Sequence, residues 1–283
     1  MTAPKMTLVI GATGKTGRRV ASGLATRGVT VRPGSRSSEI PFDWERPETW
    51  AAALDGVDSA YVTYSPDLAV PAAPPAIEKF AKMAHERGIE RLVLLSGRNE
   101  EEAQRCERIV QGVNPKWSVV RASWFAQNFS EAHFLEPLQA GVLQLPARDV
   151  PEPFVDADDI AAVAVAALTE PGHEGQVYEV TGPRALTFRE AVAEIAAATG
   201  RDLRYEQVPA DAFFEGMRAH GTPEDIIALT QFLFDTVLDG RNSETTDGVQ
   251  RALGRAPRDF AEYARATAAT GIWAAPAPAS ARG

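Results

Sequence analysis

The chain has 283 residues and a formal net charge of −9, with 45% hydrophobic and 24% charged residues, fractions typical of a globular protein. The acidic balance argues against nucleic acid or an anionic membrane as its main partner. The sequence holds no apolar stretch of membrane-spanning length, and no signal-peptide pattern precedes its first expected strand. We therefore expect a soluble, cytoplasmic protein whose partner is a small molecule, and which is a monomer or a homodimer.

Residues that commonly bind metals are few and scattered. Cys106 is the only cysteine, which excludes intrachain disulfides and a cysteine metal cluster. The four histidines, His85, His133, His173 and His220, lack the spacing of metal ligands. We expect no metal site.

The first expected element is a strand over residues 6–10, which runs into the glycines Gly11, Gly14 and Gly17 and then a helical pattern over 18–27. A strand, a glycine turn and a helix form a phosphate-binding layout. The turn exposes backbone N–H groups, and the helix N-terminus adds about half a positive charge. We expect Gly11 to allow the tight turn, Gly14 to admit a pyrophosphate, and Gly17 to let helix and strand pack closely.

The letters Gly14-Lys15-Thr16 also suggest the P-loop of nucleotide hydrolases. That motif requires a glycine five residues before Gly14, where this chain has Val9. The loop is therefore too short to wrap a triphosphate, and a dinucleotide site is favoured. An ordinary strand–turn–helix with no ligand stays open as the alternative.

A second strand is expected over residues 29–31, followed by a polar loop, 32–38. Sites that prefer NAD carry an acidic residue here to hold the ribose 2′-hydroxyl, and none occurs between Gly28 and Ser38. The loop instead holds Arg32, Arg36 and three serines, which are donors suited to a 2′-phosphate. This favours NADP over NAD, with an incidental polar loop as the alternative.

The chain then alternates between the two element types as far as residue 128. A short strand over 40–42 ends at Asp43 and Trp44, where a carboxylate often faces an adenine amino group, although an exposed turn would explain Asp43 almost as well. The further expected strands are 57–63, 91–95 and 117–120, and the helices are 47–54, 71–87 and 100–111. This alternation predicts an α/β fold, a Rossmann-type doubly wound parallel sheet with helices on both faces.

Beyond Asn128 the rhythm changes. Helices are expected over 129–140, from Asp156 to Leu168, over 187–198, 222–238 and 259–269, with strands over 142–145 and 177–180. Asp156, Asp158 and Asp159 are explained by capping of their helix, with a metal site as the weaker alternative. The expected domains are a dinucleotide-binding domain over 1–155 with sheet contributions from 156–182, a small, mostly helical substrate lobe over 183–273, and a disordered tail over 274–283.

Ligands of such sheets bind beyond the carboxyl ends of the strands. The residues that follow those ends are therefore the candidate site, and no catalytic residue is assigned. The cofactor-binding candidates are Gly11, Thr13, Gly14, Lys15, Thr16, Gly17, Arg32, Ser35, Arg36, Ser37, Asp43, Trp44, Tyr64, Ser65, Ser96, Gly97, Arg98, Ser123 and Phe125. The substrate-lining candidates are Tyr64, Ser96, Trp124, Phe125 and Asn128.

A nicotinamide cofactor would supply hydride transfer. Common short-chain dehydrogenases add a Tyr-x-x-x-Lys pair to protonate an oxyanion, but no tyrosine lies between Ser96 and Val120, and Tyr64 is followed by Leu68 at the lysine position. Iminium, conjugated or quinoid acceptors do not require that pair. Aromatic walls would suit such flat molecules, although core packing explains Trp124 and Phe125 equally well.

Four motifs in this order resemble the NmrA-like atypical short-chain dehydrogenases: the 9–17 loop, Leu-Ser-Gly at 95–97, and the stretches 121–129 and 154–161. The resemblance extends to about Trp273 and includes bacterial proteins similar to the festuclavine and agroclavine dehydrogenases of ergot-alkaloid synthesis. It implies a Rossmann domain with a C-terminal substrate lobe and usually NADPH, with Arg36 near the 2′-phosphate and residues 123–128 near the nicotinamide. Many relatives carry a lysine where this chain has Ala103, which weakens the case for ordinary acid catalysis.

Two hypotheses of different classes follow. The first is an NADPH-dependent reductase of imine, iminium or conjugated acceptors, such as an imine reductase of secondary metabolism. The second is a non-catalytic, NADP-binding redox sensor that regulates a partner protein. Isomerase or lyase chemistry with a retained cofactor stays open as a third.

Overall fold

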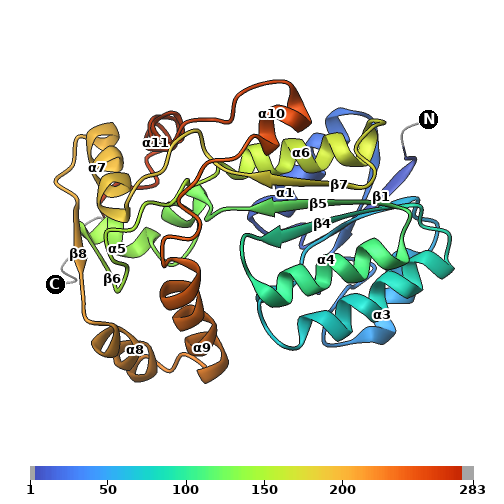
Figure 1. The fold of residues 1–283 in the computed structure, drawn as a ribbon, viewed down its shortest axis with the longest axis horizontal. Helices are drawn as coiled ribbons and strands as arrows, with labels where there is room; N and C mark the ends of the chain where they lie inside the picture. Colours follow the sequence, from blue (N-terminus) through green and yellow to red (C-terminus); the bar gives the residue numbers. More distant parts are fainter. Residues whose placement is uncertain (1–3, 276–283) are drawn as a thin grey trace, which may run out of the picture. The chain divides into compact units, whose positions relative to one another are not determined.

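A computed structural model describes residues 4–275 of the chain (Figure 1). The chain forms two compact units. The first contains the chain up to Ser123, Ala157–Thr181 and Thr245–Pro257, and the second contains Trp124–Asp156, Gly182–Glu244 and the chain from Arg258 onward. The expected tail, residues 274–283, lies largely outside the described residues.

The first unit is built on a six-stranded parallel sheet in the order β2-β1-β3-β4-β5-β7, which confirms the expected fold class. The strands are β1 (Met6–Ile10), β2 (Thr30–Gly34), β3 (Ser59–Val62), β4 (Arg91–Gly97), β5 (Lys116–Ala122) and β7 (Gln176–Val180). The helices are α1 (Lys15–Thr26), η1 (Pro47–Thr49), α2 (Trp50–Leu54), α3 (Ala73–Glu86), α4 (Glu101–Val113), α6 (Ala157–Thr169) and α10 (Gly248–Leu253).

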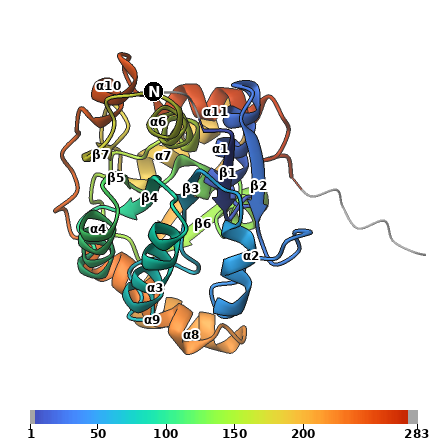
Figure 2. The same ribbon diagram turned by 90° about the vertical axis from the view of Figure 1, so that its right-hand side faces the viewer.

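Helices cover both faces of this sheet, α1 and α6 one face and α3 and α4 the other (Figures 1 and 2). The central strands are apolar because they are buried from both sides, as Leu8 and residues 92–94 show with no exposed surface. The topology reverses between β1 and β3, since β1 pairs with β2 on one side and with β3 on the other. Ligands bind beyond the carboxyl ends of the strands at such a point.

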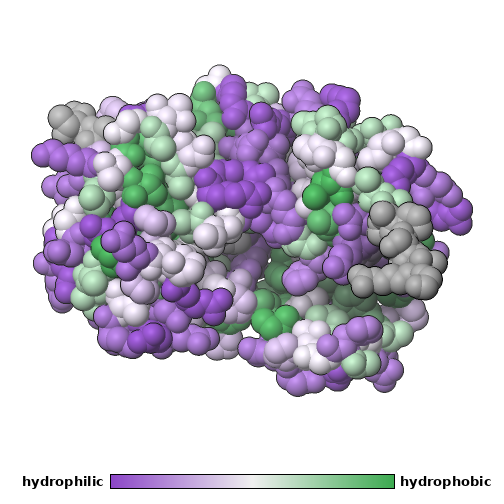
Figure 3. All heavy atoms as spheres, turned by 180° about the vertical axis from the view of Figure 1, so that it is seen from behind, coloured by the Kyte–Doolittle hydropathy of each residue, from purple (hydrophilic) through white to green (hydrophobic). Residues whose placement is uncertain are grey.

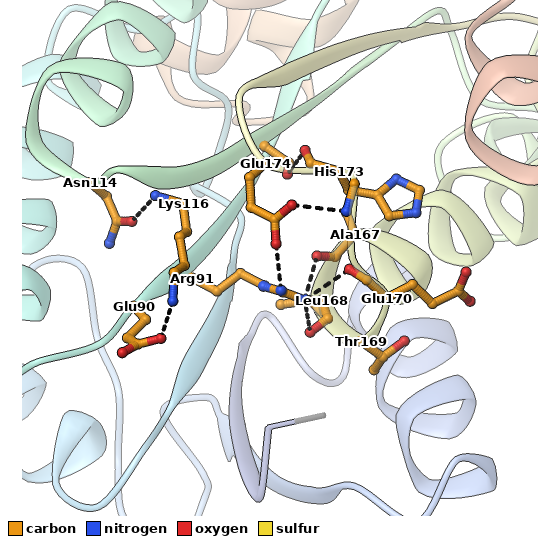
Figure 4. Close-up of polar contacts among 12 residues, drawn as sticks. Glu90, Arg91, Asn114, Lys116, Ala167, Leu168, Thr169, Glu170, His173 and Glu174 are labelled. Atoms are coloured by element: carbon orange, nitrogen blue, oxygen red, sulfur yellow. Dashed lines mark hydrogen bonds and ion pairs between the residues drawn. The ribbon is translucent and has the colours of Figure 1, made fainter. Parts of the chain in front are cut away.

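Arg91, at the amino end of β4, ties the sheet to the end of α6 (Figure 4). Its buried guanidinium donates to the carbonyl oxygens of Ala167, Leu168 and Glu170 at 3.3, 2.8 and 3.2 Å and to the Glu174 carboxylate at 2.7 Å. The last carbonyls of a helix have no hydrogen-bond donor within the helix and carry partial negative charge. A buried cation at that end supplies the donors and balances the charge.

The second unit consists mainly of helices around an aromatic core. Phe129, Phe154 and Phe188 lie at its centre, with ring centroids 5.2 to 5.8 Å apart. A two-stranded parallel sheet pairs β6 (Val142–Leu145) with β8 (Arg204–Gln207). The helices are η2 (Ala126–Phe129), α5 (Leu135–Ala140), α7 (Phe188–Thr199), α8 (Ala210–Ala219), α9 (Glu224–Phe232), the π-helical η3 (Leu233–Val237) and α11 (Phe260–Ala268).

Three expectations from the sequence differ from the structure. Residues 40–42 form no strand, because the Phe42 N–H bonds the Ser35 carbonyl within a loop rather than a neighbouring strand. The helix expected over 129–140 is broken, since Phe129 and Phe134 both face the aromatic core, and residues five apart do not share a helix face. β8 is a strand that was not expected within the mostly helical region after residue 201.

The division of the chain also differs from the expected boundary at residue 155. Residues 124–156 belong to the second unit, because their aromatic side chains pack into its core, and residues 245–257 return to the first. Within residues 245–257, a Cβ on Gly248 would lie 2.0 Å from the Glu179 carbonyl oxygen. The absence of a side chain at Gly248 therefore lets α10 pack closely against β7.

The surface carries few large apolar side chains. Among residues 4–275, Ile272 is the large apolar residue classed as exposed, with 37% of its surface accessible. Hydrophilic residues cover much of the face in Figure 3. No helix in this described range is long and apolar enough to cross a membrane.

We predict that Arg91→Met lowers the free energy of unfolding by about 2 kcal/mol or more, because buried carbonyls and the Glu174 carboxylate lose their donor. Urea unfolding of the purified protein measures this. Lys116→Met is the matched control, since it removes a more exposed cation that pairs with Glu90, and should cost about 0.5 kcal/mol or less. Equal losses for the two variants would contradict the role given to Arg91.

Candidate cofactor-binding site

The glycine loop after β1 has the close contacts that its spacing predicts. Gly11 has φ +70°, a conformation that favours glycine, and a Cβ there would lie 2.6 Å from Thr63 Oγ1. A Cβ on Gly17 would lie 2.1 Å from the Gly11 carbonyl oxygen, so only glycine lets α1 begin this near to β1. The Gly14 N–H donates to the same oxygen at 2.8 Å and closes the turn.

This loop fits a dinucleotide pyrophosphate. Gly14 is the N-cap residue of α1 and has extended backbone, with φ −81° and ψ 178°. Because it has no side chain, it offers no capping acceptor to the first-turn N–H groups, and it leaves room for an anion to approach the backbone.

The two arginines expected near the 2′-phosphate have different surroundings, because Arg32 lies in β2 and Arg36 lies in the loop after it. The Arg32 guanidinium donates to the carbonyl oxygens of Ala53, at 3.2 Å, and of Asp55, at the end of α2. Arg36 is exposed and has no hydrogen bond or ion pair with any described residue. Ser35 Oγ lies 3.3 Å from Ser37 Oγ and 2.7 Å from Ser38 Oγ, so hydroxyl groups gather beside Arg36.

An aromatic group follows the same loop. Trp44 donates from Nε1 to the Thr63 carbonyl oxygen at 2.9 Å, and its ring centroid lies 5.0 Å from those of Phe42 and Tyr64. The backbone carbonyl of Asp43 accepts from Trp50 Nε1 at 2.7 Å, and its carboxylate accepts from the Glu45 N–H at 3.1 Å. These contacts fix Trp44 and Tyr64 close to the end of β3.

Ser96, near the carboxyl end of β4, is held by a charged pair that was not expected from the sequence. Its hydroxyl donates to Glu107 Oε1 at 2.6 Å, and Arg121 donates to both oxygens of the same carboxylate at 2.9 and 2.6 Å. The bonds from Glu107 raise the pKa of the Arg121 guanidinium above its usual value. A sequence signal for this pair exists, because Glu107 lies on the apolar face of α4 with Ala103, where a charge needs a partner.

The same network continues to the end of β5. Glu179 accepts from Arg121 at 3.2 Å and from Arg98 at 2.7 Å, and Arg98 also donates to Ser123 Oγ at 3.1 Å. The side chains of Ser96, Arg98 and Ser123 are therefore engaged within the protein. Their roles toward cofactor or substrate stay predictions.

The remaining candidates, Trp124, Phe125 and Asn128, belong to the second unit. The half-buried Trp124 ring packs 5.7 Å from Phe188 and 5.5 Å from Phe234. Core packing thus accounts for part of its surface, as the sequence analysis allowed. The Asn128 N–H donates to the Phe125 carbonyl oxygen at 3.0 Å.

Comparison with known proteins now adds to this geometry. The model of the NmrA-like family matches residues 101–264. The chain belongs to the NmrA-like family.

No group of three or more potential metal ligands occurs among residues 4–275.

Two named relatives of this NmrA-like chain are reductases. It is 34% identical to a (4-alkanoyl-5-oxo-2,5-dihydrofuran-3-yl)methyl phosphate reductase of Streptomyces griseus, covering 91% of this chain and 96% of the relative. It is 30% identical to the NAD(P)H azoreductase of Xenophilus azovorans, over 93% and 98% of the two chains. The expected resemblance to ergot-type enzymes is also confirmed, with 28% identity to agroclavine dehydrogenase of Claviceps fusiformis over 90% and 95%.

Among solved structures, the fold matches the NADPH-dependent quinone oxidoreductase of Escherichia coli with a TM-score of 0.71, covering 92% of this chain and 98% of that one at 20% identity. The NmrA-like chain is an NAD(P)H-dependent oxidoreductase that acts on small molecules. The relatives thus favour the catalytic hypothesis over the sensor.

We predict that Gly14→Ala raises the Kd for NADPH at least about tenfold, which corresponds to about 1.4 kcal/mol. The new methyl group lies 3.2 Å from the Gly11 carbonyl oxygen, a tight contact that shifts the turn by a few tenths of an ångström, and it blocks the approach of a phosphate. Titration calorimetry measures the change. Gly112→Ala, which meets no atom within 4 Å, is the control and should leave binding unchanged.

Proposed function

We propose that this oxidoreductase uses NADPH to reduce a conjugated, quinoid, imine or iminium acceptor of secondary-metabolite type. The observation that carries the proposal is the missing Tyr-x-x-x-Lys pair after β4. At the carboxyl end of β4 the chain has Ser96, which bonds Glu107, and Arg98, which bonds Glu179. A chain without that pair suits acceptors that take hydride readily. The names of the relatives, with azo compounds and an oxo-dihydrofuran among their substrates, support this class.

In this proposal the glycine loop holds the pyrophosphate, and Arg36 with the serine hydroxyls holds the 2′-phosphate. Arg36 supports the choice of NADPH because it is exposed, carries no ion pair with a described residue, and stands beside Ser35 and Ser37. Arg32 is instead engaged within the protein, since its guanidinium donates to a backbone carbonyl near the end of α2. When bound, the nicotinamide supplies the hydride, and the chain's part is to bind and orient the two reactants.

Arg36→Ala should weaken NADPH binding by about ten- to a hundredfold, because a charge-assisted contact to phosphate contributes about 1.5–3 kcal/mol. NADH, which has no 2′-phosphate, should bind as before. Fluorescence titration with both cofactors gives the ratio. Arg105→Ala, which removes another largely exposed arginine, is the control, and equal losses for the two cofactors would overturn the 2′-phosphate role of Arg36.

The reaction class is tested by following NADPH oxidation with quinones, cyclic enones, azo dyes and cyclic imines or iminium ions. Turnover of at least one class is expected. If none of these compounds caused NADPH oxidation, although NADPH binding was demonstrated separately, the proposal would be contradicted. Unequal affinities for NADPH and NADP⁺ that control a captured partner protein would then favour the sensor hypothesis.

A further inference from the structure

Two acidic side chains without an assigned role follow neighbouring strands of the first unit. Asp67 lies in the loop after β3, and Glu100 lies in the turn after β4. β3 and β4 are parallel partners, with Val62 opposite Leu94, so their carboxyl ends meet at one edge of the sheet. This is the edge at which parallel α/β sheets bind ligands.

The turn after β4 directs the Glu100 side chain into the protein. Asn99 has φ +53°, a left-handed conformation that asparagine tolerates better than most residues, and it reverses the chain before α4. Glu100 is the N-cap residue of α4, yet its carboxylate makes no capping bond. It lies instead over Gly97, where a Cβ would be 2.2 Å from its Cδ, Oε1 and Oε2 atoms. Gly97 thus leaves the space that the carboxyl group fills.

This carboxyl group is isolated from cations that could keep it ionised. Glu100 is 7% exposed, and its Oε2 has no hydrogen-bond donor among the described residues. The titratable groups that act on it are Asp67, from the loop after β3, and Glu107, from α4. Arg98, two residues before Glu100, bonds Glu179, and Arg121 bonds Glu107.

Burial, together with the negative charges of Asp67 and Glu107, raises the pKa of Glu100 well above its usual value. Burial also raises the pKa of Asp67, although the Ala69 N–H donates to its Oδ1 at 2.9 Å. The two carboxyl groups are within side-chain hydrogen-bonding reach of each other, and such a bond requires a proton on one of them. Ionising both groups would carry a large electrostatic cost. Asp67 is the more exposed member of the pair.

We propose that the Asp67–Glu100 carboxyl pair retains one proton at neutral pH and delivers it to the anion that forms when a neutral acceptor is reduced. This inference rests on the proposed reductase function and supplies the proton source that the missing Tyr-x-x-x-Lys pair leaves open. Glu100 Oε2 holds the proton, and Asp67 passes it outward.

The step balances in atoms and electrons. Hydride adds its hydrogen and two electrons to the acceptor, and the π pair of the C=C, C=N or C=O system moves onto a heteroatom or carbon as an anion. The O–H bond of the carboxyl pair breaks, its electrons stay on the carboxylate, and the proton bonds to that anion. Water then returns a proton to the pair. A cationic iminium becomes neutral on gaining hydride, so its reduction needs no proton from the pair.

Glu100→Gln is the test variant, because glutamine fills the same space over Gly97 and cannot donate an acidic proton. For neutral quinones or enones, kcat should fall by about a hundredfold, the scale of general acid catalysis. For a quaternary iminium ion, kcat should change less than about threefold, far below that scale. Asp67→Asn should give the same pattern, and Glu101→Gln, the same change at the exposed neighbouring residue, should affect neither class.

The pH profile separates a proton donor from a merely structural residue. In the wild type, kcat for enones should fall as pH rises through the pKa of the pair, because the donor must be protonated. In Glu100→Gln this fall should disappear. Equal losses for neutral and cationic acceptors, or an unchanged pH profile, would overturn the inference, whereas a wild type inactive on every acceptor would overturn the proposed function itself.

Unfolding of the cofactor-free protein provides a readout that does not depend on activity. A carboxyl group whose pKa is raised by folding binds more protons in the folded state, so the free energy of unfolding decreases as pH rises from the usual glutamate pKa of about 4.3 toward the raised value. Glu100→Gln lacks this loss and should gain stability relative to the wild type across that window. Urea midpoints that differ by a constant amount at every pH would contradict a retained proton.

Discussion

A chain of charged hydrogen bonds holds together the edge of the sheet on which the site depends. Glu107, Arg121, Glu179 and Arg98 alternate in sign and link α4 with the carboxyl ends of β4, β5 and β7. Glu107 and Arg98 are buried, and removing the partner of a buried charge leaves it unpaired, which typically costs about 3–5 kcal/mol. The network therefore fixes the ends of three strands, and with them the positions of Ser96 and Ser123.

The same network has an electrostatic consequence for the neighbouring turn. Arg98 and Arg121 are each paired with a carboxylate, and neither of them neutralises Glu100. An edge rich in arginine thus contains a carboxyl group that favours its neutral form. The pairing of charges, more than their number, decides where a proton is held.

The parts of the molecule that could be predicted from sequence depend on local contacts. The glycine loop follows from its spacing, and the capping box of α7, formed by Thr187 and Glu190, follows from residues three apart. Other features depend on contacts distant in sequence. The direction of Arg32 is set by the end of α2, the broken helix after Phe129 by the aromatic core, and the inward turn of Glu100 by the space over Gly97. Hydrophobic periodicity and short motifs do not indicate which distant residues make these contacts.

The order in which the chain visits its two units bears on how this fold can diversify. The chain changes unit after Ser123, Asp156, Thr181, Glu244 and Pro257, so neither unit is one uninterrupted fragment. The second unit is in effect encoded as insertions that follow β5 and β7 and as a C-terminal extension, while the sheet and its glycine loop are encoded around them. Mutation, insertion or exchange within those segments can reshape the second unit without altering a strand of the six-stranded sheet. Such a gene architecture lets the second unit vary while the six-stranded sheet and its glycine loop stay constant.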